Sequence, residues 1–270
     1  MHSMLEAPFP SRILFAAAMI GLGIAGLVNG DFALSWQHVP VHHLPGGAYI
    51  AYACALIELA TGIGLLFKPT LTLSVRILFP YLLLWVAACK LSVLVLRPLD
   101  GDSWGSLGEI AIMAAGGWCL FASHARLRAE SRLGFLVGER GIRAARFLLI
   151  ISLPMLGQVH LLNLEGVAGF VPAWLPYHVA WAFLTGVASF AAAAGMTFGV
   201  FPRLAATLET IMLGCITLFT WGALLDTGRT AVTAFLISAA LTAGTWLVAD
   251  TYRGVPWLAR GRASRQISAL

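Results

Sequence analysis

The feature that most constrains the fold is a series of eight apolar runs, each about as long as a helix that crosses a bilayer. Such a helix needs about 20 mostly apolar residues. Only 11% of the residues are charged, whereas a soluble domain carries about 25%. We therefore predict an all-α integral membrane protein, which excludes secreted enzymes, nucleic-acid-binding proteins and disordered scaffolds. The predicted spans are 12–29, 48–67, 71–95, 107–123, 147–164, 179–200, 204–225 and 231–249.

Basic residues are distributed unevenly between the two sets of loops that eight spans create. Fourteen of the lysines and arginines fall on the side of the two termini, and only Arg97 and Arg229 fall on the opposite side. Cytoplasmic loops carry such an excess of Lys and Arg. We expect a multi-pass protein of a cell membrane, the bacterial inner membrane, with both termini cytoplasmic. The basic segment 124–146 is expected to lie on the anionic leaflet or, alternatively, to recruit a soluble partner.

The two halves of the chain resemble one another at an offset of about 131 residues. Arg12 matches Arg143 and Gly26 matches Gly157, and the Val-Pro and Leu-Pro pairs of the first external loop return before the sixth run. An even number of spans gives both copies one orientation, with a pseudo-twofold axis along the membrane normal. We predict two parallel-repeated four-helix bundles: a first unit 1–123, the basic linker 124–146, a second, degenerate unit 147–250 and a basic tail 251–270.

Three of the charged residues inside the apolar runs of the first half are functional candidates, because each costs at least about 2.5–3.5 kcal/mol at a helix centre. Lys90 and Glu109 are expected to pair in the outer half of the membrane, with Glu58 deeper in the same bundle interior. Glu58 is the candidate catalytic residue, as a proton acceptor, and Lys90 would hold a carbonyl or anionic group. A quinone headgroup fits such a site. The alternative is a buried ion pair that fixes helix register.

Histidines suggest two further sites. His160, near the outer end of the fifth run, could join the pocket across the pseudo-twofold axis. No other histidine lies deep in a span, so haem, which needs paired histidines here, is not expected. The first external loop holds His38, His42 and His43, which could bind copper or zinc. The second copy of this loop keeps only His178, so we expect no metal site.

Two other groups are expected to be structural. Arg76 and Glu209 occupy equivalent positions of the third and seventh runs, and we expect them to form a bridge between the halves. The cysteines show no metal-ligand or disulfide spacing and are expected to be small buried side chains; whether Cys54 and Cys89 approach each other stays open. No Walker loop, dinucleotide-binding or HExxH motif is present, so catalysis by this chain alone is not expected.

The segment 57–67, IELATGIGLLF, resembles the second span of the DoxX-like family, in which an acidic residue opens a Glu-Leu-x-x-Gly-x-x-Leu-Leu pattern. The second half is similar to another sequence motif of that family, through FVPAWLP at 170–176 and the later Leu-Thr-Gly. Two departures stand out. The acidic position becomes Ser189 in the sixth run, and the lysine often found near the end of the first span is Asn29 here and His160 in the copy. The second half therefore looks chemically degenerate, and Asn29 and His160 join the candidate ligand-binding residues.

The resemblance implies a membrane subunit, since the family includes the small membrane subunit of a thiosulfate:quinone oxidoreductase and membrane partners of thiol and oxidative-stress enzymes. We expect a quinone or other lipid-soluble ligand, a sulfur- or thiol-linked redox partner, and at most the role of a subunit in a quinone-linked oxidoreductase. The alternatives are a small-solute or proton-coupled transporter, which parallel repeats suit, and a structural assembly factor. A nucleic-acid partner is not expected, and homo-oligomer formation stays open.

Overall fold

The computed structural model describes residues 9–32, 46–87, 95, 99–127 and 133–261, and these form helices and turns without a β-strand. Among these residues, eight helices are long and apolar enough to cross a membrane, which confirms the prediction of an all-α membrane protein with eight spans. The short helix α7 (Leu164–Ala168) lies between two of them. The long helices are α1 (Phe9–Asn29), α2 (Gly47–Leu66), α3 (Lys68–Leu84), α5 (Gly101–His124), α6 (Gly138–Leu162), α8 (His178–Phe198), α9 (Pro202–Cys215) and α10 (Arg229–Asp250).

Helix boundaries follow local chemistry, and one of them lies inside the predicted linker. Pro69 and Pro202 each stand in the first turn of their helix, α3 and α9, where a proline costs no hydrogen bond. α6 begins at Gly138, so residues 138–146 of the expected linker belong to a helix. The sequence predicts a partly amphipathic segment on the membrane surface here, and a helix can continue from the bilayer into the interfacial layer with charged side chains exposed.

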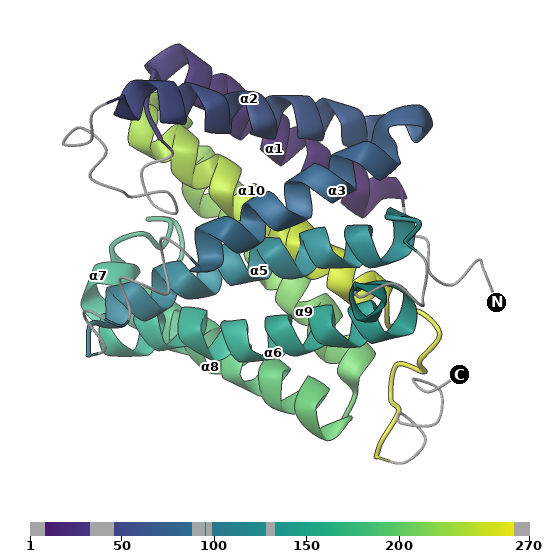
Figure 1. Ribbon diagram of the computed structural model, residues 1–270. Helices are drawn as coiled ribbons and strands as arrows, with labels where there is room; N and C mark the ends of the chain where they lie inside the picture. Colours follow the sequence, from purple (N-terminus) through teal and green to yellow (C-terminus); the bar gives the residue numbers. More distant parts are fainter. Residues whose placement is uncertain (1–8, 33–45, 88–94, 96–98, 128–132, 262–270) are drawn as a thin grey trace.

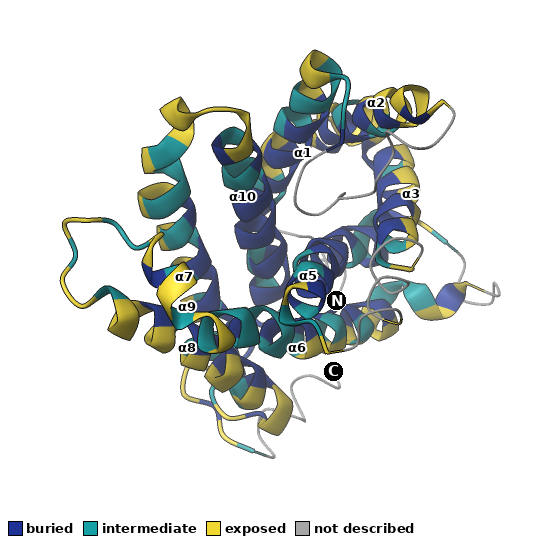
Figure 2. Cartoon of the chain, turned by 90° about the vertical axis from the view of Figure 1, so that its left-hand side faces the viewer, coloured by how far each residue is buried: buried dark blue, intermediate teal, exposed yellow. Residues whose placement is uncertain are grey.

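Each long helix packs on its neighbours in the chain. α10, the last helix, also packs on α1, the first, so that the long helices form a closed ring. Equivalent neighbours occur in both halves: α1–α2 and α6–α8, α2–α3 and α8–α9, α3–α5 and α9–α10. The last helix of each half also packs on the first helix of the other, and α5 meets α10 in the middle of the ring (Figure 2). α1 begins and α10 ends at the same end of the molecule (Figure 1).

The two central helices are buried because small residues bring their backbones together. Of the apolar 18-residue stretch in each span, 83% is buried in α5 and 72% in α10, whereas 22–44% is buried in the other six spans. A Cβ atom added to Gly116 of α5 would lie 2.5 Å from the Cα atom of Gly244 in α10, so the backbones touch. Close approach over small residues is the main packing device of helices in lipid. The other six helices turn large apolar side chains outward, toward the bilayer.

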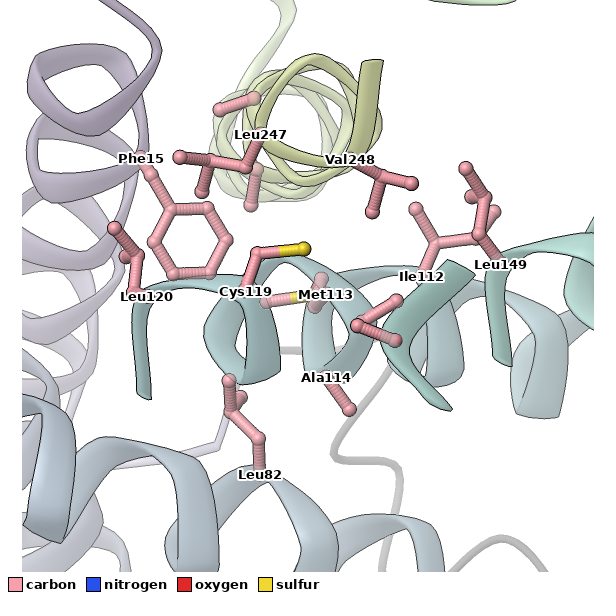
Figure 3. Packing of buried hydrophobic residues seen from close by; sticks show 14 of the residues in the cluster. Phe15, Leu82, Ile112, Met113, Ala114, Cys119, Leu120, Leu149, Leu247 and Val248 are labelled. Atoms are coloured by element: carbon pink, nitrogen blue, oxygen red, sulfur yellow. The ribbon is translucent and has the colours of Figure 1, made fainter. Parts of the chain in front are cut away.

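Around this crossing, side chains from five helices meet in one apolar core (Figure 3). Phe15 comes from α1, Leu82 from α3, Met113 from α5, Leu149 from α6 and Leu247 from α10, and each is fully buried. The core therefore joins the two halves of the chain into one packed unit.

The segment after α10 packs on the turn between α8 and α9. The backbone N–H of Phe201 donates to the carbonyl of Ala259 at 2.8 Å, and the guanidinium of Arg260 lies 4.9 Å from the centre of the Phe201 ring. These contacts hold Phe201 in a left-handed conformation with φ of 53°, which is costly for a non-glycine residue. Arg203 lies 3.9 Å from the ring centre of Trp257 and donates to two backbone carbonyls of the same segment.

At the opposite end, an ion pair joins the start of α10 to the end of α1. Arg229 Nη2 lies 3.2 Å from Asp31 Oδ2 and donates to the carbonyl of Phe32 at 3.3 Å. One of the two basic residues expected on this side is thus neutralised by an acid. The other, Arg97, lies outside the described residues.

Candidate functional site

Glu58 lies on the buried face of α2. Ala55, Thr61 and Leu65, which share this face at helical spacing, are buried as well, and the Glu58 residue is only 2% exposed. Small residues bring α1 close on this side, since a Cβ atom on Gly26 would lie 2.8 Å from the Cβ atom of Ala55. The helix packing therefore directs a carboxyl group into the protein and away from lipid.

Tyr81 of α3 is the hydrogen-bond partner of this carboxyl group. Its phenol donates to Glu58 Oε1 at 2.6 Å, and the tyrosine is 7% exposed. The Tyr81 ring meets Trp85 edge-on, with centroids 6.3 Å apart, and Trp85 meets Phe32 in the same manner at 5.5 Å. A carboxyl–phenol pair bordered by aromatic rings thus lies between α2, α3 and the end of α1.

This pair can do two things chemically. A carboxyl group and a phenol can each exchange a proton, and in their protonated forms each can donate a hydrogen bond to a carbonyl oxygen. Tyr81 was not among the candidate residues predicted from the sequence, although a signal was present: a tyrosine inside an apolar run has a phenol that needs a partner when buried.

The other ionisable residues of the first half are only partly described. Lys90 and Cys89 lie outside the described residues, so the expected Lys90–Glu109 pair and the approach of Cys89 to Cys54 stay predictions. Glu109 is half-buried on α5, directly after Gly108, which packs on the backbone of α6.

The two residues added from the family resemblance form their hydrogen bonds away from Glu58. The Asn29 side-chain amide donates to the carbonyl of Ala25 in its own helix at 2.6 Å, and Asn29 is exposed. His160 is half-buried, and its Nδ1 atom lies 2.8 Å from Thr185 Oγ1 on α8. His160 therefore belongs to a polar contact within the second half.

The second half has a buried carboxyl group of its own. Ser189 of α8, which matches Glu58 in the predicted repeat, donates its hydroxyl to Glu209 Oε1 of α9 at 2.8 Å. Both residues are 2% exposed. The carboxyl group comes from the third long helix of this half, whereas in the first half it comes from the second.

The expected bridge between Arg76 and Glu209 is wrong. Arg76 is exposed, and its Nε atom donates to the carbonyl of Ala125 at 2.8 Å. The physical reason is the position of the two central helices, since α5 and α10 lie between α3 and α9 (Figure 2). Residues of α3 and α9 that match in the predicted repeat are therefore kept apart.

Both third helices are irregular at matching positions. α9 continues as a π-helical turn, Ile216–Trp221, and α3 continues as a π-helical turn over residues 85–87. Aligning Pro69 with Pro202 places residues 85–87 opposite 218–220. In the second half, the Thr217 hydroxyl lies 2.7 Å from Ser238 Oγ and 3.0 Å from Thr242 Oγ1 of α10. π-helical turns are rare and occur frequently at functional sites.

No group of three or more metal-ligating side chains occurs among the residues that the structure describes, and His38, His42 and His43 lie outside them. No protein-family model, curated protein or solved structure matches the chain. What the protein does therefore has to be inferred from its two buried carboxyl groups and the residues around them.

Proposed function

We propose that the protein is a DoxX-like membrane subunit that binds a quinone, or another lipid-soluble ligand with carbonyl groups, at Glu58 and Tyr81. The observation that carries the proposal is the 2.6 Å hydrogen bond between these two buried side chains. Ionisable residues inside a membrane are costly and are functional candidates by default. Here the carboxyl group belongs to the segment that resembles the DoxX-like family.

The chemistry of the pair suits a quinone. A quinone carbonyl needs a hydrogen-bond donor, and its reduction takes up protons together with electrons. Tyr81 and Glu58 supply donors and protons, and the neighbouring rings of Phe32 and Trp85 make the surroundings of the pair apolar. Lys90 is the candidate for the second carbonyl. The carboxyl and phenol groups transfer protons but not electrons. We therefore propose that a sulfur- or thiol-linked partner protein exchanges the electrons with the quinone.

The proposed location is a bacterial inner membrane with the basic end of the bundle in the cytoplasm. Arg203, Arg253 and Arg260 cluster where α10 ends, and the start of α1 lies at this same end (Figure 1). An excess of Lys and Arg is characteristic of the cytoplasmic side.

Replacing Glu58 by glutamine or Tyr81 by phenylalanine is expected to lower the bound quinone at least about ten-fold. Each variant removes a hydrogen bond or a proton carrier, and ten-fold corresponds to about 1.4 kcal/mol. The measurement is mass spectrometry of an organic extract from gently purified protein, followed by titration with added quinone.

Two variants on the surface serve as matched controls. Tyr49→Phe removes an exposed phenol from α2, and Glu165→Gln removes an exposed carboxyl group from α7. Both should retain the quinone content of the wild type. Quinone retained by Glu58→Gln and Tyr81→Phe, or a wild-type protein that binds no added quinone, would refute the proposal.

A proton-coupled transporter of small solutes is the second candidate, and the matching π-helical turns of α3 and α9 favour it. Parallel repeats and paired interruptions of helices are typical of transporters. On this reading, vesicles containing the protein should acidify or alkalise when a solute gradient is imposed, and Glu58→Gln should abolish the pH change. The quinone reading gives no such pH change in the absence of a redox partner.

A further inference from the structure

The second half contains a buried carboxyl group that the proposed quinone site does not use. Glu209 receives its hydrogen bond from the hydroxyl of Ser189, and within the described ranges no cation lies within ion-pair distance of it. An isolated carboxylate in an apolar environment is strongly disfavoured. The carboxyl group therefore needs a proton, or a bound cation, in the resting protein.

Polar side chains lead from Glu209 to the end of α6. Thr185 and Ser189 are one turn apart on α8 and share a face of that helix. Thr185 Oγ1 lies 2.8 Å from His160 Nδ1, and Ser189 Oγ lies 2.8 Å from Glu209 Oε1. His160 stands in the last turn of α6. An imidazole and two hydroxyl groups thus lie in a row between a helix end and the buried carboxyl group. The Ser189 hydroxyl contacts the backbone carbonyl of Thr185 rather than its hydroxyl, so a proton that passes between the two hydroxyls needs a bridging water molecule.

Ser189 can form a hydrogen bond in either protonation state of Glu209. Its hydroxyl oxygen also lies 3.4 Å from the backbone carbonyl of Thr185. When Glu209 is ionised, the serine hydroxyl donates to it. When Glu209 is protonated, the acid can donate to Ser189 Oγ, while the serine proton turns to the carbonyl of Thr185. Neither state leaves a buried donor without an acceptor.

Among the described residues, no charged neighbour fixes the protonation state of this carboxyl group. The helices packed on α9 are α8 and α10, and their titratable side chains are His178, Arg229 and Asp250, all at helix ends. Arg229 and Asp250 take part in ion pairs of their own. On α9 itself, Arg203 is occupied by backbone carbonyls at the opposite end from His160.

We propose that Glu209 binds and releases a proton inside the membrane, and that His160, Thr185 and Ser189 connect it to water at the loop end of α6. The site is separate from the Glu58–Tyr81 pair and does not depend on a ligand there. It would serve a quinone-linked subunit and a transporter equally.

Infrared difference spectra of the full-length protein in lipid bilayers test the proton site. Recorded over about pH 5 to 9, where buried carboxyl groups titrate, they should show a carbonyl band of a neutral acid that disappears as Glu209 ionises. Glu209→Gln should remove this band, and Glu58→Gln should leave it in place. Ser189→Ala keeps the carboxyl group but removes the oxygen that accepts the proton of the neutral acid, so the band should move to higher frequency. A spectrum in which Glu209→Gln removes no titrating band would overturn the proposal.

Hydrogen–deuterium exchange of the same band tests the connecting path. Thr185→Val keeps the shape of the side chain and removes its hydroxyl, and it should slow exchange at Glu209 at least about ten-fold. Thr197→Val is the matched control on α8, because Thr197 is exposed and bonds only to its own helix. Equal exchange rates in the wild type, Thr185→Val and His160→Phe would overturn the path.

Discussion

Replacing Gly116 by leucine is expected to prevent α5 and α10 from packing and to abolish the recovery of folded protein. Even the single Cβ atom of alanine would lie 2.5 Å from the Cα atom of Gly244, and a Cβ atom on Gly244 would lie 2.9 Å from the carbonyl oxygen of Ile112. These neighbours are backbone atoms, so both helices would have to move apart. Overpacking of this kind costs about 1–3 kcal/mol for a small addition, and leucine adds three further carbon atoms.

Size-exclusion chromatography in detergent and thermal unfolding followed by tryptophan fluorescence measure this effect. Gly116→Ala should give a folded protein with a lower Tm, and Gly116→Leu should give aggregate. Gly214→Ala is the control, because its Cβ atom would meet Thr242 Cγ2 at 3.5 Å, an ordinary contact. If Gly116→Ala unfolds at the temperature of the wild type, the two backbones are not in the contact described.

Replacing Arg146 by lysine is expected to lower the free energy of unfolding by about 2–3 kcal/mol. The guanidinium donates from Nε to Thr251 Oγ1 at 2.8 Å and from Nη2 to the carbonyl of Thr251, and it lies 4.1 Å from the ring centre of Tyr252. Burial raises the pKa of Tyr252, so its ring remains neutral as a partner of the cation. A lysine keeps the charge but cannot form this set of contacts at once.

Arg143→Lys provides the comparison, since Arg143 is exposed on the same helix. Thermal unfolding should show a loss for Arg146→Lys and almost none for Arg143→Lys. Equal losses in the two variants would show that the contacts with Thr251 and Tyr252 do not stabilise the end of α10.

The helix content was predictable because a membrane imposes its thickness on the sequence. Each apolar run corresponds to one of the eight helices, since every backbone polar group must be satisfied within the span. The start of α6 was not predictable from hydropathy. Its first turns are charged, and charged residues are common both in helices at the membrane surface and in loops. The ring closure of α10 on α1 was not predictable either, since helix neighbours depend on which small residues face each other.

For the candidate site, the sequence allowed a prediction about single residues but not about pairs. Glu58 could be proposed because a carboxyl group in an apolar run is costly whichever way that face of the helix points. The contacts of Tyr81 and Ser189 depend on how far neighbouring helices are rotated about their axes. This rotation could not be predicted from a single sequence. The repeat suggested the wrong partner for Glu209, since equivalence in sequence is not proximity in space.

Because α1 packs on α10, the first helix to be synthesised acquires this partner only when the last helix has been made. α1 leaves the ribosome long before α10, yet Gly21 of α1 packs closely on Leu236 of α10. Lipid or an insertion chaperone must cover that side of α1 until translation reaches α10. A nascent chain that stops before α10 therefore leaves this face of α1 without its partner helix.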